Sequence, residues 1–439
     1  MSLLLFEGPA GSGKTTRLMK ELASVLEIRP LAVHERVLAL TKMHGSRRQL
    51  QQRLSKVSCL YGQFRCVTVD SFAWRLVKRW RSIYRVRFGG EPKAGKYEEY
   101  CRSAGNLLND PLVSQWVNKT FPIVIVDEMQ DIKEGQLAMI QGLSKVAICL
   151  AAADYYQDLN DDWLNPAVMW AHECAEVVEL TNIHRTKATG LLQASKGIRE
   201  SCSVPDNGNG FSVLGALNCN VGAMYVSQRL EWWRAKYDDI AVISPVHAKS
   251  SRFVRNLITR VEKSPIGTGK KYGPHHVRWE TSQQDEEDKF ITQLTLPDDP
   301  LALVQASDIS LPSESAVSEA LAAWLDKQRR IAGRKTFSVA ELREQISQVY
   351  QRIRAYRTTH MKGVRAMTIP QAKNREFDAV IVLWPYEITG SLERQRRLLY
   401  NAITRAKNEA LVVVQNPERL EKPPFVADAQ PRLTAYIGR

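Results

Sequence analysis

A glycine-rich segment near the start of the chain constrains the fold more than any other feature. Residues 8–16, Gly-Pro-Ala-Gly-Ser-Gly-Lys-Thr-Thr, fit the pattern G-x-x-x-x-G-K-[ST] of a phosphate-binding loop. The apolar run at residues 2–6 predicts a buried strand before the loop, and apolar residues at helical spacing over 16–26 predict a helix after it. A glycine-rich turn that matches by chance is the alternative, which this context disfavours. The segment therefore predicts the strand, loop and helix that open an α/β domain.

The chemistry of this loop follows from its backbone and from two side chains. Glycines let the chain curl so that its N–H groups point at phosphate oxygens, at the positive end of the helix dipole. Lys14 is placed to reach the β- and γ-phosphates, and the Thr15 hydroxyl to hold Mg²⁺. The loop residues predicted to bind a nucleoside triphosphate and its metal are Gly8, Gly11, Ser12, Gly13, Lys14, Thr15 and Thr16.

Two adjacent carboxylates supply the second half of such a site. The apolar run at residues 121–126 ends in Asp127 and Glu128. A strand this apolar is typical of a parallel sheet buried on both faces, and its C-terminal end would lie beside the loop. An exposed acidic turn is the alternative, which the presence of the loop disfavours. We therefore predict that Asp127 holds Mg²⁺ through water, and that Glu128 orients the attacking water and accepts its proton.

Composition and charge narrow the class of partner. The chain has 439 residues, enough for roughly two to four domains, and a formal net charge of +14. This excess predicts a polyanionic partner, usually a nucleic acid, although a merely soluble basic protein is the alternative. Seven cysteines without a C-x-x-C pair predict a reduced, cytoplasmic protein without a cysteine metal site. No apolar stretch approaches the ~18 residues of a membrane span, so no membrane partner is expected.

Apolar, strand-like runs recur along the chain with helical segments between them, an alternation that favours α/β domains with parallel sheets. Examples are residues 37–40, 147–150, 240–243 and 379–383. Two such regions are each interrupted by an insertion. The predicted boundaries are 1–75 and 120–176 for a first domain, 76–119 for a short basic insertion, 177–264 and 356–439 for a second domain, and 265–355 for a partly irregular insertion.

The positive charge is concentrated in one part of the chain. Fourteen lysines and arginines between residues 42 and 96 face only two acids, Asp70 and Glu91. The rings of Phe72, Trp74, Trp80 and Tyr84 are interleaved with them. Cations for phosphates and rings for bases are typical of a groove for single-stranded nucleic acid. A solvated helix face whose rings belong to the core is the alternative.

Several motifs, taken together, resemble those of a known family. Residues 126–131 read Val-Asp-Glu-Met-Gln-Asp, residues 153–157 Ala-Asp-Tyr-Tyr-Gln, residues 184–186 His-Arg-Thr, and residues 397–406 Arg-Leu-Leu-Tyr-Asn-Ala-Ile-Thr-Arg-Ala. They are similar to motifs II, III, IV and VI of the UvrD/Rep/PcrA-type helicases of superfamily 1. Further similar segments, in family order, are residues 37–41, 67–72, 238–243 and 367–378.

The resemblance implies an architecture and the roles of several residues. It implies two RecA-like P-loop NTPase domains in tandem that close over ATP and Mg²⁺, with reduced 1B- and 2B-like insertions. Gln157 would sense the γ-phosphate, and Arg185 and Arg405 of the second domain would neutralise charge on the transferred phosphoryl group. Glu376 would contact the ribose or the γ-phosphate region. For Arg405, an ordinary surface salt bridge is the alternative.

The resemblance also implies a track for nucleic acid. Three threonines at motif positions would bind the DNA backbone. Lys42 stands where the family usually has a stacking phenylalanine, and Trp163 lies close to the position of a stacking tryptophan. The predicted nucleic-acid-binding residues are Thr41, Lys42, Thr68, Phe72, Trp163 and Thr368.

The expected function is that of an ATP-dependent translocase or helicase on single-stranded DNA. The short insertions favour one alternative, a nucleic-acid-sensing ATPase that regulates a partner nuclease without processive unwinding. Compact UvrD-like subunits of Gabija-type anti-phage systems are similar to such a protein. A small-molecule P-loop kinase would not carry the later motifs.

Overall fold

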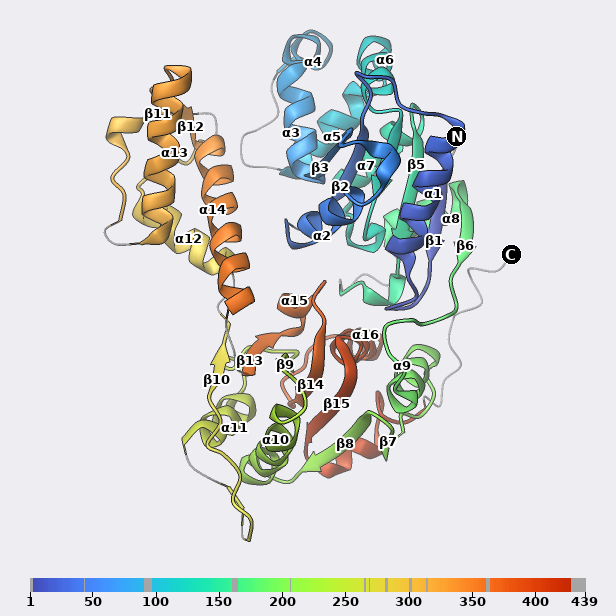
Figure 1. Ribbon diagram of the computed structural model, residues 1–439, viewed down its shortest axis with the longest axis vertical. Helices are drawn as coiled ribbons and strands as arrows, with labels where there is room; N and C mark the ends of the chain where they lie inside the picture. The colour runs from blue at the N-terminus through green and yellow to red at the C-terminus, as the bar shows by residue number, and fades with distance from the viewer. Residues whose placement is uncertain are drawn as a thin grey trace.

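Two sheets built mainly of parallel strands, each between layers of helices, form two lobes stacked along the long axis of the molecule (Figure 1). This arrangement confirms the expected α/β class with two parallel-sheet cores. The structure is a computed structural model. It describes residues 3–42, 44–90, 97–159, 165–205, 207–263, 266–267, 269–280, 283–299, 302–312, 315–360 and 364–427. Within those ranges no helix combines the length and the apolar composition needed to cross a membrane.

The first lobe contains a six-stranded sheet in the order β3-β2-β4-β5-β1-β6, in which every pair is parallel. Its strands are β1 (Leu3–Glu7), β2 (Val37–Thr41), β3 (Phe64–Thr68), β4 (Ile123–Val126), β5 (Ile148–Ala153) and β6 (Glu176–Glu179). Its helices are α1 (Lys14–Ile28), α2 (His44–Leu54), α3 (Val69–Arg79), α4 (Arg81–Phe88), α5 (Tyr97–Leu107), α6 (Pro111–Thr120), α7 (Glu134–Ser144) and α8 (Pro166–Cys174).

The apolar run of β4 is explained by burial on both faces. Ile123 and Ile125 pack in the core layer under α1 and α2, whereas Val124 and Val126 pack in the opposite layer with α3, α5 and α7. Because alternate side chains of a strand point to opposite faces, a strand covered by helices on both sides must be apolar throughout. Parallel pairing then brings the carboxyl ends of β1, β2, β4 and β5 to one edge of the sheet.

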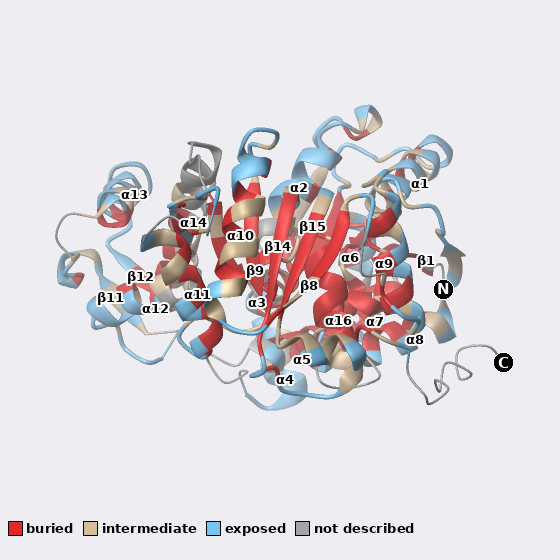
Figure 2. Cartoon of the chain, turned by 90° about the horizontal axis from the view of Figure 1, so that it is seen from below, coloured by how far each residue is buried: buried red, intermediate tan, exposed pale blue. Residues whose placement is uncertain are grey.

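The second lobe contains a seven-stranded sheet in the order β10-β13-β9-β14-β15-β8-β7. Its strands are β7 (Asn207–Gly208), β8 (Phe211–Ala216), β9 (Ile240–Ser244), β10 (Val277–Trp279), β13 (Val364–Thr368), β14 (Phe377–Trp384) and β15 (Ala406–Gln415). The β7–β8 pair is antiparallel and the other pairs are parallel. Its helices are α9 (Thr189–Glu200), α10 (Cys219–Arg234), α11 (Arg252–Lys263), α15 (Ile369–Ala372) and α16 (Leu392–Ile403). Figure 2 shows β9, β14 and β15 buried between these helices.

A smaller helical unit stands beside the two lobes (Figure 1). It consists of α12 (Gln283–Gln293), α13 (Ala316–Ala332), α14 (Val339–His360) and an antiparallel pair formed by β11 (Leu303–Gln305) and β12 (Thr336–Ser338). Leu321, Phe337 and Ile346 lie in a core of its own. An ion pair of 3.4 Å joins Glu344 of this unit to Arg75 of the first lobe.

The elements depart from the expected boundaries at three places. The strand β6 extends the first sheet to Glu179, beyond the boundary predicted at residue 176, because it pairs with β1. The strand β10 pairs with β13 and so belongs to the second sheet, although it lies within the predicted insertion 265–355. The predicted insertion 76–119 is not a separate unit, because side chains of α5 and α6 fill the core of the first lobe.

The first lobe inserts two side chains into the core of the second. Ala10 of the phosphate-binding loop and Tyr156, in the short 3-10 turn after β5, are buried in the hydrophobic cluster of α9, α16 and the second sheet. The Tyr156 hydroxyl donates a hydrogen bond of 2.8 Å to the Ile198 carbonyl of α9. Its ring meets that of Tyr400 edge-on, with centroids 5.0 Å apart. The two lobes therefore share a packed core directly behind the loop.

We expect this shared core to contribute to global stability. Tyr156→Phe removes only the buried hydroxyl and should lower the free energy of unfolding by about 1 kcal/mol. Tyr156→Ala also removes the ring and should cost about 3–5 kcal/mol. Urea unfolding measures both values. Tyr61→Phe is the matched control, since Tyr61 is 88% exposed, and should change stability by less than about 0.5 kcal/mol. A Tyr156→Ala variant as stable as the control would contradict the shared core.

Candidate functional site

The loop at residues 8–16, the predicted phosphate-binding loop, has the left-handed backbone conformations that its glycines favour. Gly11 and Gly13 have φ values of 80° and 83°, the left-handed region that favours glycine. A Cβ on Gly11 would lie 2.5 Å from the Cβ of Arg185, so the second lobe also requires a glycine here. The Ser12 hydroxyl is buried and has no hydrogen-bond partner among the described residues. Lys14 is the first residue of α1, so the loop lies at the positive end of that helix.

Lys14 is held between the loop and a buried carboxylate. Its ammonium group donates hydrogen bonds of 2.8 and 3.0 Å to the carbonyl oxygens of Gly8 and Pro9. It also lies 3.8 Å from a carboxylate oxygen of Asp154. Burial lowers the pKa of Lys14, and the nearby charges of Asp154 and Glu128 act against that shift.

The two predicted carboxylates follow β4 directly. Asp127 is buried, and its N–H donates to the Leu40 carbonyl of β2 at 3.1 Å. Burial, together with the neighbouring Glu128 carboxylate, raises the pKa of Asp127 to about 7. Glu128 has a φ of 61°, which is uncommon for a residue with a Cβ, and the Gln130 amide binds its carboxylate. Strained backbone of this kind is concentrated at functional sites.

The residues present fit a nucleoside triphosphate and Mg²⁺. The loop offers N–H groups, a lysine and the unpartnered Ser12 hydroxyl to phosphate oxygens. The Thr15 hydroxyl and the Asp127 carboxylate are hard oxygen donors of the kind that Mg²⁺ prefers. Within the described ranges no group of three or more histidine, cysteine or acidic side chains is placed to hold a metal by itself. Protein oxygens, phosphates and water would therefore share the coordination.

The second lobe brings two arginines to the same place. Arg405 follows α16. Its guanidinium group donates a hydrogen bond of 2.9 Å to the side-chain oxygen of Gln157 in the first lobe. Arg185 donates a hydrogen bond of 2.9 Å to the Thr404 carbonyl and forms an ion pair of 2.8 Å with Glu376. Burial and the charge of Arg185 lower the pKa of Arg405 to about 10. Four residues that are distant in the sequence, Gln157, Arg185, Glu376 and Arg405, thus converge from both lobes.

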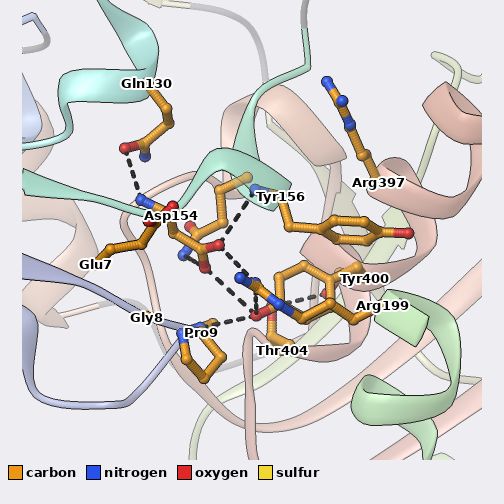
Figure 3. A network of polar contacts seen from close by, with 12 residues as sticks. Glu7, Gly8, Pro9, Gln130, Asp154, Tyr156, Arg199, Arg397, Tyr400 and Thr404 are labelled. Atoms are coloured by element: carbon orange, nitrogen blue, oxygen red, sulfur yellow. Dashed lines mark hydrogen bonds and ion pairs between the residues drawn. The ribbon is translucent and has the colours of Figure 1, made fainter. Parts of the chain in front are cut away.

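The structure adds three residues that the predicted site does not contain. Asp154, Arg199 and Tyr400 form a buried polar network beside the loop (Figure 3). Asp154 could have been found, because it follows the apolar run of β5 just as Asp127 follows β4. Arg199 carries no local signal, since it is one of several charged residues near the end of α9. Tyr400 lies in a recognised motif, but the shorter hydrogen bonds of its hydroxyl, to the Ala10 N–H and to Asp154, reach the other lobe.

The predicted nucleic-acid-binding threonines share one structural position. Thr41, Thr68 and Thr368 are the last residues of β2, β3 and β13. Thr41 and Thr68 are register partners in the first sheet. Both are buried, and the Thr68 hydroxyl accepts 3.2 Å from the Ser71 N–H at the start of α3. Thr368 is half-buried, and its N–H donates 2.8 Å to the Gln371 side chain.

Two lysines from different lobes meet between these strand ends. Lys42 follows Thr41, and its ammonium group donates to the main-chain carbonyl of Asp131. Lys373 of the second lobe forms an ion pair with the Asp131 carboxylate. Burial lowers the pKa of Lys42, while Asp131 acts against that shift. Motif positions of the two lobes are therefore connected through Asp131.

The predicted aromatic contacts to nucleic acid are placed differently. Phe72 is only 3% exposed and packs edge-on against Phe121 at 5.9 Å. Trp74 and Trp80 pack against the same core. The amphipathic pattern of α3 explains this difference, since rings at helical spacing face the core. The alternative of core rings beneath a solvated face therefore describes Phe72, and the prediction that it contacts bases is wrong in this structure. Trp163 lies outside the described residues.

The basic residues around α4 lie away from the edge between the lobes. Figure 1 places α4 at the end of the first lobe that is remote from the second lobe. The exposed cations there are Lys78, Arg79, Arg81, Arg85 and Arg87. Arg87 forms an ion pair of 2.7 Å with Asp110, and Arg79 lies 4.4 Å from the ring centroid of Trp116. Among the described cations of this segment, Lys42 thus lies at the strand ends, whereas the five near α4 lie on a distant surface.

The comparison with known families concerns the second lobe. Residues 363–413 match the family of UvrD-like helicase C-terminal domains. This stretch includes β13, α15, β14, α16 and most of β15, and with them Thr368, Glu376, Tyr400 and Arg405. The match supports the resemblance to UvrD-type helicases in this part of the chain. A search among curated proteins found no significant match.

The raised pKa of Asp127 makes a prediction about stability. The folded protein keeps this proton up to pH of about 7, whereas an unfolded chain loses it near pH 4. The group therefore stabilises the fold below pH 4, and this contribution is lost as the pH rises through 7. In metal-free protein, the free energy of unfolding of Asp127→Asn should rise relative to that of the unmodified chain as the pH increases from 5 to 8. The relative gain should exceed about 1 kcal/mol.

Urea unfolding at a series of pH values, with a chelator present, measures this gain. Asp238→Asn is the control, because Asp238 is exposed on the same protein. A difference between Asp127→Asn and the unmodified chain that stays constant with pH would show that Asp127 is ionised throughout.

Proposed function

We propose that the chain is an ATP-dependent single-stranded DNA translocase or helicase that hydrolyses ATP between its two lobes. The hydrogen bond from Arg405 to Gln157 carries this proposal, because it joins an arginine of the second lobe to the first lobe beside Glu128 and Lys14. The family match over residues 363–413 supports a nucleic-acid-dependent ATPase. A site divided between two lobes lets hydrolysis depend on how the lobes are arranged.

In the proposed reaction the first lobe binds the nucleotide and activates the attacking water. Lys14 and the loop N–H groups bind the β- and γ-phosphates, while Thr15 and Asp127 hold Mg²⁺. The bound ion supplies positive charge that offsets the charge of the phosphates. Glu128 orients the attacking water and accepts its proton. The Gln130 amide on the Glu128 carboxylate keeps this base in place.

The second lobe completes the proposed site. Arg405 and Arg185 neutralise the charge that develops on the transferred phosphoryl group, and Gln157 of the first lobe senses the γ-phosphate. Glu376 holds Arg185 through the 2.8 Å ion pair. Burial of Arg405 strengthens its electrostatic effect, since charges interact more strongly in a region of low dielectric constant.

Nucleic acid is proposed to lie along the carboxyl ends of β2, β3 and β13. Half-buried Thr368, together with Lys42 and Lys373, would contact backbone phosphates and sugars, while the buried Thr41 and Thr68 would support the edge of the sheet beneath them. Asp131 binds both lysines, so a shift of one lobe against the other changes the cations presented to the strand. This is the proposed route from the ATP site to movement on DNA.

One observation favours a second candidate function. The helices α5 and α6 of segment 76–119 pack into the first lobe, and the described residues of the other insertion form a small unit of three α-helices, one 3-10 turn and two short strands. A protein with such small accessories is suited to act as a nucleic-acid-sensing ATPase that regulates a partner nuclease without processive unwinding. An unwinding assay on 3′- and 5′-tailed duplexes separates the two candidates.

The first test is stimulation of ATP hydrolysis by nucleic acid. Turnover of MgATP should rise on addition of single-stranded DNA. Lys14→Ala should reduce it by at least about 10²-fold, because a charge on the β- and γ-phosphates is lost. Lys20→Ala is the matched control, an exposed lysine on the same helix. Equal turnover with and without DNA and RNA would argue against a nucleic-acid motor.

The second test concerns the arginines of the second lobe. Arg405→Ala should lower kcat by about 10³-fold and change the KM for ATP by less than about threefold, since the interaction is made mainly in the transition state. Arg185→Ala should behave similarly, and Arg255→Ala, an exposed arginine of the same lobe, should match the unmodified chain. Steady-state kinetics gives both constants. Hydrolysis at a normal rate in Arg405→Ala would mean that the second lobe does not act on the phosphate.

A further inference from the structure

The carboxylate of Asp154 is the centre of the buried network behind the phosphate-binding loop (Figure 3). Asp154 follows β5 and is completely buried. One carboxylate oxygen accepts a hydrogen bond of 2.7 Å from the guanidinium group of Arg199. The other carboxylate oxygen accepts a hydrogen bond of 2.8 Å from the Gln157 amide and lies 3.8 Å from the Lys14 ammonium group. One buried anion thus faces the loop lysine from the first lobe and Arg199 from the second.

Tyr400 connects the same carboxylate to the backbone of the loop. Its hydroxyl accepts a hydrogen bond of 2.8 Å from the Ala10 N–H and donates one of 3.3 Å to the Asp154 carboxylate. The hydroxyl has no other role in the proposed reaction. The second lobe therefore holds the main-chain N–H of Ala10 directly through Tyr400, and it acts on the Lys14 side chain through Asp154.

Arg199 is built into this position. It lies near the end of α9, and its side chain is 18% exposed. Its guanidinium group lies 4.7 Å from the ring centroid of Tyr155 and 5.5 Å from that of Tyr156. Rings on these sides and the carboxylate on another restrict its orientation. Residues with this many fixed contacts are pre-organised for positioning.

The charges explain why Arg199 matters to Lys14. A buried carboxylate is costly unless cations neutralise it, and Asp154 is shared by two of them. If Arg199 were removed, Lys14 would be the one cation left within ion-pair distance of Asp154 among the described residues. The carboxylate would then hold Lys14 more strongly, in competition with the phosphates that Lys14 is proposed to bind.

We propose that Arg199 is a positioning residue of the ATP site. By neutralising Asp154 from the second lobe, it keeps Lys14 available to phosphate and keeps the Tyr400 hydroxyl on the Ala10 N–H. The inference rests on the proposed ATPase function and goes beyond it, because Arg199 touches neither the phosphates nor the attacking water in that scheme. It makes the affinity for nucleotide depend on a charge of the second lobe.

The test is the effect of Arg199→Met on binding and on catalysis separately. We expect the KM for MgATP, and the Kd of a fluorescent ATP analogue, to rise by about tenfold while kcat changes by less than about threefold. This is the opposite of the pattern expected for Arg405→Ala. Arg199→Lys keeps the charge and should recover most of the affinity. Lys196→Met is the control, because that lysine lies on the same helix and its side chain is 73% exposed.

A double-mutant cycle shows whether the effect passes through Asp154. In the Asp154→Asn background the carboxylate is absent, so Arg199→Met should change the analogue Kd by less than about twofold. Tyr400→Phe, which keeps the ring on Tyr156, should weaken analogue binding as well. Urea unfolding of each variant confirms that it folds. If Arg199→Met does not fold, Arg199→Lys carries the test.

Two results would overturn the inference: an unchanged Kd in Arg199→Met, or an equal effect of that substitution with and without the Asp154 carboxylate. The outcomes also separate this inference from the proposed function. A wild-type protein that binds the analogue but hydrolyses no ATP would refute the ATPase and leave the Kd cycle to decide about Arg199. A protein that binds no nucleotide would refute both.

Discussion

The buried carboxylate of Asp154 is the interaction on which the arrangement of the two lobes depends. It accepts from Arg199 and Tyr400 of the second lobe and lies 3.8 Å from Lys14 of the first. An isolated charge at this depth would be unstable, so its partners must stay in place. Because these partners come from both lobes, the ionic contact and the phosphate-binding loop are parts of one structure.

Apolar packing surrounds this polar contact. Ala10 and Tyr156 of the first lobe enter the core of the second, and the ring of Tyr400 packs against Tyr156. Exclusion of water by these groups strengthens each hydrogen bond and ion pair within the network. The same exclusion explains why Arg405 is useful in the proposed chemistry, since a guanidinium group shielded from solvent acts strongly on nearby charge.

Much of the site could be predicted from the sequence because its signals are local. The loop around Lys14 needs glycines at fixed spacing, and Asp127 ends an apolar strand that only a sheet covered on both faces requires. Arg199 could not be predicted, because its role depends on a contact with Asp154, 45 residues away in the chain. Phe72 was placed on the wrong surface, since an aromatic ring among arginines suits a core as well as a nucleic-acid groove.

The sequence by itself determined the α/β class, the glycine-rich turn at residues 8–16 and the strands that end before Asp127 and Asp154, because backbone geometry and burial act over a few residues. Tertiary structure alone decided which lobe supplies each partner of that loop. It also decided that β10 joins the second sheet and that α4 lies far from the edge between the lobes. These features depend on how two separate sheets pack against each other, and no local pattern of residues records that packing.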